Sequence, residues 1–357
     1  MAYTNIDDPS AYFQTALYTA TASAQSITND GNSDLQPDFI WFKRRNSTVV
    51  HAYFNSTTGN NKYLYTGNGD SPAEVTASAG EGLLTFDSDG FSLGTHQGVT
   101  NASGGTYVAW QWKANGGTTT AFSESGSNPG GTRQTNTDAG FSIISYTGTG
   151  SNGTIAHGLP STPEFIIFKR RDAANFWCVW HQAIGDDYKL ALQLDAGLDA
   201  DGAFMASTLP TSTNITVGGA SVNTNADGGT YICYAFSPIQ GYSKFGSYVG
   251  NGSTNGPFVY TGFKPAFIMR KRTDGSGGWD ILDYKRDPTN LADQFLTADA
   301  NGAESNYLDI FSIDILSNGF KFRTNRYESN QSGSTYIYMA FAENPFVTST
   351  GIPTTAR

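Results

Sequence analysis

The sequence PDFIWFKRR at residues 37–45 recurs twice more in a chain of 357 residues, as PEFIIFKRR at 163–171 and as PAFIMRKRT at 265–273. In each copy, apolar residues that favour strands precede a short basic run. That pattern is typical of a buried β-strand that ends at the protein surface. Recurrence of one pattern along a chain indicates a repeat architecture, so further elements of the repeat are expected around it.

A second recurring segment follows each copy at a nearly constant distance. It reads NASGGTYVAW at 101–110, NADGGTYICY at 225–234 and NQSGSTYIYM at 330–339. The proline of the first segment and the threonine of the second are 69, 67 and 70 residues apart in the three copies. A tyrosine also stands 17 to 19 residues before each proline, as Tyr18, Tyr146 and Tyr248. The same elements are not expected to recur three times at nearly the same spacing by chance, so the chain is interpreted as a triplication.

This spacing divides the chain into three modules, which we place at residues 1–113, 140–240 and 241–347, followed by a tail at 348–357. Residues 114–139 are rich in Gly, Ser, Thr and Asn, and we expect them to form a flexible linker that lets the first module swing. Almost nothing separates the second module from the third, so these two are expected to pack closely.

Turn signals between short alternating segments predict an all-β fold. Leu83–Phe86 and Phe91–Leu93 flank one turn, and Ile313–Leu316 and Phe320–Phe322 flank another that contains Asn-Gly. Asn-Gly is a strong hairpin signal, because both central residues of a type I′ turn need positive φ. Strands at intervals of about 8–12 residues favour antiparallel sandwiches over βαβ units. We therefore expect three tandem antiparallel β-sandwich modules, jelly-roll-like, with about seven or eight strands each.

Composition and charge exclude some classes of function. The net charge is −10 and only 15% of residues are charged, so the surface repels phosphate backbones and nucleic acid is not an expected partner. No apolar run is long enough to span a membrane, so no membrane insertion is expected. The N-terminus MAYTNIDDP lacks the basic start and apolar run of a secretory signal, which predicts assembly in a host cytoplasm.

The basic ends of the first recurring segment are candidate binding residues for anionic glycans or phosphate. They follow a buried strand in every copy, which favours a structural role instead: long stems cover the sheet and charged heads pair with Asp and Glu at the surface. The residues are Lys43, Arg44, Arg45, Lys169, Arg170, Arg171, Lys271 and Arg272.

Tryptophans that follow the second and third basic runs are the candidate glycan contacts. Exposed indole rings offer apolar faces on which sugars stack. In modules of this size, such rings more often pack in a core or between modules, and both interpretations stay open. The residues are Trp177, Trp180 and Trp279.

No metal-binding or catalytic constellation is found. The four histidines, at positions 51, 96, 157 and 181, lack metal-ligand spacing. The acidic run at 194–202 lacks the final Glu of an EF-hand loop and is expected to be a surface loop, although calcium binding there stays open. Cys178 and Cys233 lie in apolar segments and are expected to be buried free thiols. With no nucleophile elbow, P-loop or dinucleotide motif, we expect no enzyme, no catalytic residues, no metal and no cofactor.

Three segments resemble repeat proteins encoded by marine tailed phages, a family of tail-fibre and virion structural proteins. The segments read GYSKFGSYVGNGS at 241–253, GPFVYTGF at 256–263 and YIYMAFAENPF at 336–346. The resemblance is strongest over the second and third modules, and the first follows it more loosely. It implies a virion protein built from β-sandwich repeats, and it carries over no catalytic residues.

The leading hypothesis is a non-catalytic tail-fibre or spike component that contacts the host cell surface. Its expected partners are other virion proteins and a host surface glycan, with weak contacts adding up through linked copies. A capsid decoration or head-fibre protein is the alternative. A glycan-degrading tail enzyme is the second alternative, although carboxylate pairs occur in any chain with 31 acidic residues and are no signal for it. We expect a homo-oligomer, with a trimer favoured, whose interface is formed by sandwich faces because the sequence has no heptads.

Overall fold

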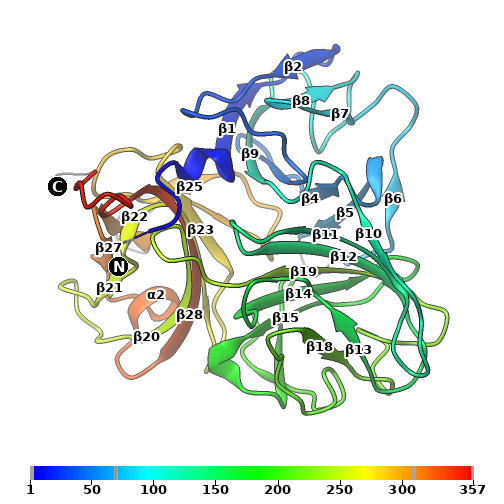
Figure 1. The fold of residues 1–357 in the computed structure, drawn as a ribbon. Helices are drawn as coiled ribbons and strands as arrows, with labels where there is room; N and C mark the ends of the chain where they lie inside the picture. The colour runs from blue at the N-terminus through cyan, green and yellow to red at the C-terminus, as the bar shows by residue number, and fades with distance from the viewer. Residues whose placement is uncertain (1–3, 68, 70, 307–310, 355–357) are drawn as a thin grey trace.

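The computed structural model describes residues 4–67, 69, 71–306 and 311–354, and over these residues the fold is all-β with antiparallel sheets. Three large sheets are each accompanied by a smaller sheet of two or three strands. Figure 1 shows three lobes around a common centre, coloured blue to cyan, green, and yellow to red. We call residues 4–113, 140–240 and 241–347 the first, second and third repeats. None of the helices in the described ranges has the length and apolar character needed to cross a membrane.

The first repeat has a large sheet of order β1-β9-β3-β4-β5-β6 and a smaller sheet of order β2-β8-β7. The short helix η1 (Pro9–Ala11) precedes the first strand. The strands are β1 (Phe13–Thr19), β2 (Gln25–Ile27), β3 (Phe39–Arg44), β4 (His51–Asn55), β5 (Gly59–Thr66), β6 (Val75–Thr76), β7 (Leu83–Asp87), β8 (Gly90–Leu93) and β9 (Thr106–Trp112).

The second large sheet has the order β10-β11-β12-β19-β14-β15-β16-β17, and β13 pairs with β18 in the smaller sheet. The short helix η2 (Gln182–Ile184) follows β15. The strands are β10 (Thr120–Phe122), β11 (Gly131–Asn136), β12 (Phe141–Thr147), β13 (Gly153–Ala156), β14 (Phe165–Arg170), β15 (Trp177–His181), β16 (Tyr188–Ala191), β17 (Asp199–Ala200), β18 (Asn214–Val217) and β19 (Thr230–Phe236).

The third large sheet has the order β20-β28-β22-β23-β24-β25, and the smaller sheet has the order β21-β27-β26. The one-turn helix α2 (Tyr327–Asn330) precedes the last strand. The strands are β20 (Ser243–Val249), β21 (Phe258–Tyr260), β22 (Phe263–Arg272), β23 (Asp280–Asp283), β24 (Gln294–Thr297), β25 (Ser305–Asn306), β26 (Ile313–Leu316), β27 (Gly319–Phe322) and β28 (Thr335–Pro345).

The recurring sequence elements occupy matching places in the three large sheets. The last strand of each repeat (β9, β19 or β28) lies between the first strand (β1, β12 or β20) and the strand of the basic segment (β3, β14 or β22). The register matches as well, since the tyrosine of the first strand faces the tyrosine of the last: Tyr18 with Tyr107, Tyr146 with Tyr231, and Tyr248 with Tyr336. The outer limits of the modules stay a prediction.

Residues 114–139 are not the flexible connection that we expected, because they extend the second sheet. Strand β11 pairs along its whole length with β12, and β10 pairs with β11. Gln134 in β11 is buried, and its side-chain amide bonds Gly117, Ser56 and Thr57. A polar segment lacks the apolar alternation that marks a strand, but its backbone is still satisfied by pairing with an existing sheet edge. The first repeat is thereby held against the second.

Both expected hairpins form, but the second does not use its Asn-Gly as the centre of the turn. Leu316 pairs with Gly319, which leaves Ser317 and Asn318 as the two turn residues, and neither has positive φ. Gly319 instead lies at the start of β27, where a Cβ atom would come 2.1 Å from the carbonyl oxygen of Val259 in the paired strand β21. The glycine is needed for this close approach and not for the turn conformation.

Gly319→Ala is therefore expected to lower the free energy of unfolding by about 1–3 kcal/mol, because β21 must shift to admit the methyl group. Gly302→Ala is the matched control, since its Cβ would meet nothing within 4 Å and the residue does not have positive φ. Urea unfolding of the two variants measures the difference. Equal stabilities would show that β21 yields to the methyl group at no cost.

The strands of the basic segments are buried on both faces, and this places one core at the centre of the molecule. In β3, Phe39 and Trp41 belong to a hydrophobic cluster that contains residues of all three repeats, whereas Ile40 and Phe42 belong to a cluster inside the first repeat. Ring contacts link each repeat to the next around this centre. The centroid distances are 4.4 Å for Phe39–Tyr234, 6.0 Å for Phe165–Phe245 and 5.8 Å for Phe267–Phe13.

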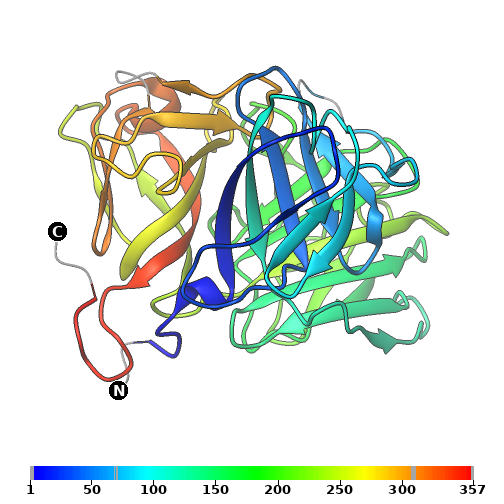
Figure 2. The ribbon, with the colours of Figure 1, turned by 90° about the horizontal axis from the view of Figure 1, so that it is seen from above.

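The two ends of the described chain lie beside each other, next to the third repeat (Figure 2). Ser349 donates hydrogen bonds to Asp7 from its backbone N–H at 2.6 Å and from its hydroxyl at 2.5 Å. Thr4 donates to the carbonyl of Gln240 at 2.9 Å. The start of the first repeat is thus bound to the segments on both sides of the third.

Candidate functional site

The three recurring lysines are buried and connect the repeats in cyclic order. Each ammonium group donates to backbone carbonyls of its own loop and to one carbonyl of another repeat. The carbonyls from the other repeat are Asn301 for Lys43 (3.2 Å), Ser71 for Lys169 (3.2 Å) and Asp195 for Lys271 (3.0 Å). The first repeat thus bonds the third, the second bonds the first and the third bonds the second. We call these three lysines the lysine clamps.

The lysine heads were expected at the surface beside Asp and Glu, and that expectation is wrong. All three lysines have 0% exposure, because a loop of the neighbouring repeat covers each one and offers carbonyl oxygens in place of water. The sequence of one repeat cannot show that its strand end will be covered by a distant loop.

The second basic residue of each run stays closer to the surface and bonds within its own loop. Its guanidinium donates to a side-chain oxygen two residues later, in the pairs Arg44–Asn46 (3.0 Å), Arg170–Asp172 (2.9 Å) and Arg272–Asp274 (2.8 Å). Partly exposed pairs of this kind add little stability, so they mainly shape the loop.

The third basic residue bridges two repeats in two of the three copies. Arg45 forms an ion pair with Glu304 of the third repeat at 2.7 Å, and Arg171 forms one with Glu74 of the first at 2.8 Å. The third copy has Thr273 at this place, and its carbonyl accepts a bond from the backbone N–H of Leu198 in the second repeat. The same cyclic order of contacts therefore holds at this position.

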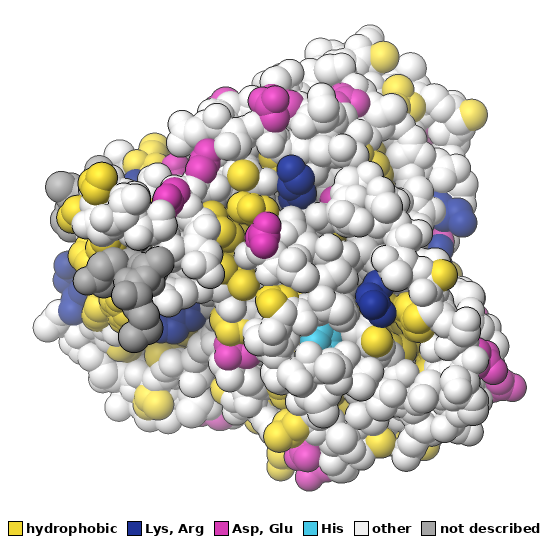
Figure 3. Space-filling model, in the orientation of Figure 1, with side chains coloured by type: hydrophobic (Ala, Val, Ile, Leu, Met, Phe, Trp, Pro, Cys, Tyr) yellow, Lys and Arg dark blue, Asp and Glu magenta, His cyan; other side chains and the backbone are white. Residues whose placement is uncertain are grey.

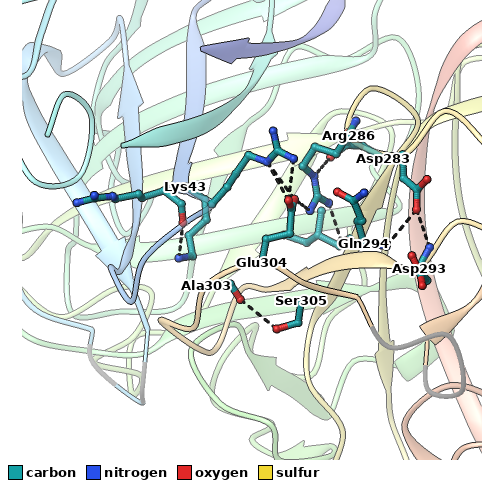
Figure 4. Close-up of polar contacts among 12 residues, drawn as sticks. Lys43, Asp283, Arg286, Asp293, Gln294, Ala303, Glu304 and Ser305 are labelled. Atoms are coloured by element: carbon teal, nitrogen blue, oxygen red, sulfur yellow. Dashed lines mark hydrogen bonds and ion pairs between the residues drawn. The ribbon is translucent and has the colours of Figure 1, made fainter. Parts of the chain in front are cut away.

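A buried polar network joins the first and third repeats (Figure 4). Arg286 lies between Asp283 and Glu304, bonding Asp283 through Nε and Glu304 through Nη1 at 2.8 Å. Asp283 also accepts a bond from the indole N–H of Trp110 in the first repeat at 3.0 Å. The side chains of Asp283 and Arg286 are fully buried, so each charge depends on the other.

The three candidate glycan-contacting tryptophans have no ring face open to a sugar. Trp177, Trp180 and Trp279 are 0%, 2% and 1% exposed. The indole N–H of Trp177 donates to Tyr65 of the first repeat at 3.1 Å, and that of Trp279 donates to Ala191 of the second at 2.9 Å. These tryptophans therefore pack within and between repeats, and a glycan contact has to be sought elsewhere.

The acidic run and the cysteines also have structural surroundings. Lys189 pairs with Asp199 at 2.6 Å and with Asp201 at 2.8 Å, while Asp195 contributes its backbone carbonyl to a lysine clamp. Within the described ranges, no group of three or more His, Cys, Asp or Glu side chains is placed to hold a metal ion. Cys178 and Cys233 are buried free thiols.

The lysine clamps make stability depend on pH. Burial lowers the pKa of Lys43 to about 7 and that of Lys169 and Lys271 to about 8, whereas an unfolded lysine titrates near 10.5. Between these values the unfolded chain holds more protons than the folded chain, so the free energy of unfolding rises with pH. Above about pH 9 the rise becomes less steep, because burial raises the pKa of Cys178 to about 12 and the unfolded chain loses that proton first.

We therefore expect the protein to be more stable at about pH 8.5 than at about pH 7, by up to about 1.4 kcal/mol per pH unit for each deprotonated clamp. Urea unfolding at the two pH values tests this expectation. In Lys43→Met the rise should be smaller, since one of the three titrating groups is gone. A stability that stays level or falls between the two pH values in the unmodified chain would contradict the expectation.

A pocket with a volume of about 530 Å³ lies where the second and third repeats meet. Such a volume is typical of a small-molecule site. The second repeat contributes Glu164 and Gln182, and the third contributes Ser243, Lys244 and Tyr260. Apolar side chains, among them Phe245, Phe346 and Val347, line the rest.

A change in sequence explains why the pocket opens at this junction. Five residues before the shared tyrosine of the first strand, the first and second repeats have Phe13 and Phe141, and the third has Ser243. Both phenylalanines pack into the shared core, where Phe13 contacts Phe267 and Phe141 contacts Phe39. The alignment of the three copies already contains this difference, and the fold shows that Phe245, two residues later in the same strand, makes the ring contact with Phe165 here instead.

The polar side chains of the pocket are of both charge signs. Glu164 accepts a hydrogen bond from Gln182 at 2.8 Å, and Lys244 donates to the carbonyl of Tyr260 at 2.7 Å. Burial raises the pKa of Glu164, and the charge of Lys244 opposes that shift. Tyr260 keeps 54% of its surface exposed at the rim.

On the face shown in Figure 3, charged side chains are scattered singly over a mostly uncharged surface.

The chain belongs to a family described as a domain of unknown function, DUF7483, whose model matches residues 8–345. No curated protein and no solved structure matches the chain. This match extends over all three repeats, so the family corresponds to the whole assembly and not to a single repeat.

Proposed function

We propose that this member of the family is a non-catalytic structural protein of a tailed-phage virion, a tail-fibre or spike component that contacts the host cell surface. The resemblance of residues 241–263 and 336–346 to phage repeat proteins supports the virion assignment. The polar, triplicated β fold is consistent with a long-lived structural part.

The observation that carries the structural role is the use of buried and partly buried charged groups to join the repeats. The lysine clamps, the Arg45–Glu304 and Arg171–Glu74 pairs and the Asp283–Arg286 pair all bond one repeat to another or support such a bond. Charged groups in an active site would be directed at a substrate. Here these groups bond neighbouring repeats and so hold the molecule together, as a structural protein requires.

Formation of a homotrimer stays a prediction, but its interface needs to be revised. The inward faces of the large sheets already pack against each other within one chain. A trimer of chains would therefore have to use other surfaces, such as those near the adjacent chain ends.

Immunogold electron microscopy of the parent particles, with antibody against this chain, tests the proposal. Gold on the tail supports the fibre or spike assignment, and competition between the purified chain and phage adsorption then tests host contact. Gold over the head would make the chain a capsid decoration or head-fibre protein. Particles without label would contradict a virion role.

Incubation with host polysaccharide separates the proposal from a glycan-degrading tail enzyme. A non-catalytic protein releases no new reducing ends, whereas an enzyme does.

A further inference from the structure

The three junctions between repeats are built alike, and comparison of them shows what is unusual about the pocket. At each junction, the residue before the recurring Phe of the basic segment lies close to a neighbouring repeat. These residues are Asp38, Glu164 and Ala266. The junctions differ in two ways: in how many hydrogen bonds the carboxylate at this point already accepts, and in the volume of the cavity beside it.

At the junction of the first and second repeats, the carboxylate of Asp38 is fully used. It accepts bonds from the hydroxyl of Ser56 and from the backbone N–H groups of Ala114, Gly116 and Gly117, at 2.6 to 2.9 Å. Asp38 has 0% exposure, and the segment that follows the first repeat covers it.

At the junction of the third and first repeats, Ala266 supplies no carboxylate, and Phe13 packs on Phe267. A cavity of only about 210 Å³ remains, and the ion pair between Lys285 and Asp30 lies at its wall. The carboxylate of Glu343 also lines this cavity, so its smaller volume, and not the lack of an acceptor, distinguishes this junction.

At the junction of the second and third repeats, both space and acceptors are available. Ser243 replaces the phenylalanine, and the pocket is about two and a half times the volume of the other cavity. Among the described residues, only the Gln182 side chain is bonded to the Glu164 carboxylate, compared with four donors at Asp38. Glu164 therefore has acceptor capacity for groups that a ligand brings.

We propose that this pocket binds a neutral saccharide unit of a surface glycan, with Glu164 and Gln182 bonding its hydroxyl groups and Tyr260 packing on its apolar face. The proposal deepens the proposed function, on which it rests, by naming the ligand class and its site.

The chemistry of the lining favours a neutral, hydroxyl-rich ligand. Glu164 and Lys244 have opposite charges, so the pocket does not select strongly for an anion or a cation. The Gln182 amide already donates its N–H groups to Glu164 and to the carbonyl of Phe245, so its carbonyl oxygen and the Glu164 carboxylate are the acceptors left for the hydroxyl groups of a ligand. The ring of Tyr260 has an ammonium group over it at 5.2 Å and still exposes half its surface, which suits the C–H face of a sugar.

A second exposed ring extends the aromatic surface beyond the pocket. Phe258 is 45% exposed and stands two residues before Tyr260 in β21, so both side chains lie on the same face of the strand. Val259 between them is buried. If one saccharide unit of a glycan is bound in the pocket, the adjacent unit would contact the ring of Phe258.

Saturation-transfer difference NMR on the full chain tests the proposal. The probes are the methyl glycosides of glucose, galactose and mannose, together with N-acetylglucosamine and, as an anionic comparison, glucuronic acid. We expect saturation transfer to at least one neutral probe. The signal should fall about tenfold in Tyr260→Ala, which removes the stacking face.

Ser243→Phe is the second variant, because it restores the ring found at the same place in the first and second repeats and so fills the pocket. In Ser243→Phe, saturation transfer to the neutral probe should be abolished. Tyr188→Ala is the control, since Tyr188 is 41% exposed and lies outside the pocket, and its signal should equal that of the unmodified chain.

No transfer to any neutral probe, transfer to glucuronic acid alone, or transfer that persists in both pocket variants would overturn the proposal. If gold labels the tail and the chain competes with adsorption while these results are negative, only the saccharide site is wrong. If the particles are unlabelled, the proposed function fails whatever the pocket binds.

Discussion

Replacing Asp283 with alanine is expected to lower the free energy of unfolding by about 3–5 kcal/mol, because it removes one of the two carboxylates that pair with a buried arginine. The side chain of Arg286 has 0% exposure and lies between Asp283 and Glu304. The indole N–H of Trp110 would lose its acceptor at the same time. The first and third repeats would thus lose a buried hydrogen bond that joins them.

Asp274→Ala is the control for this prediction. Asp274 also pairs with an arginine, Arg272 at 2.8 Å, but its side chain is 39% exposed, so its removal should cost less than about 1 kcal/mol. Guanidinium unfolding of both variants measures the difference. If both variants lost a similar amount of unfolding free energy, burial of the Asp283–Arg286 pair would add nothing to its contribution to stability.

Replacing Trp112 with alanine is expected to lower the free energy of unfolding by a comparable amount, about 3–5 kcal/mol, because it opens a cavity in the shared core. The indole contacts Phe13 and Phe39 of its own repeat, and it contacts Phe267 and Phe341 of the third, with ring centroids 4.9 to 5.7 Å apart. Truncation therefore weakens the first repeat and its contact with the third together.

Trp112→Phe separates loss of volume from loss of a polar contact. The indole N–H of Trp112 has no hydrogen-bond partner among the described residues, so phenylalanine sacrifices no bond there. Phe236 and Phe341 occupy the same place in the other two repeats. We expect Trp112→Phe to cost well under half of what Trp112→Ala costs, as measured by thermal unfolding, and an equal cost would point to a polar role for the indole.

The strands and their order in the sequence could be predicted from local patterns. Apolar residues before a basic run marked β3, β14 and β22, and turn residues marked the hairpins. These features depend on residues close together in the chain, so periodicity and turn chemistry suffice.

The contacts between repeats could not be predicted, because their partners lie far apart in the sequence. Lys43 looked like a surface cation, and only a carbonyl more than 250 residues later explains its burial. Trp177 and Trp279 were candidate surfaces for sugar stacking, but their indole N–H groups donate to the backbone carbonyls of Tyr65 and Ala191 in other repeats. Residues 131–136 lacked a strand pattern because an existing sheet edge, and not an apolar face, holds them.

The candidate pocket was missed for a related reason. Its residues come from two repeats, and the decisive one, Ser243, is notable only for what it replaces. Alignment of the three copies shows a serine where two phenylalanines stand. The consequence of that change depends on how the copies pack, which the alignment does not contain.

The central claim is that three repeats form one structural unit around a shared core. Differential scanning calorimetry of the unmodified chain tests it most directly. The claim predicts a single transition whose calorimetric and van't Hoff enthalpies agree. Two or three transitions, or a calorimetric enthalpy several times the van't Hoff value, would show that the repeats unfold independently and would contradict it.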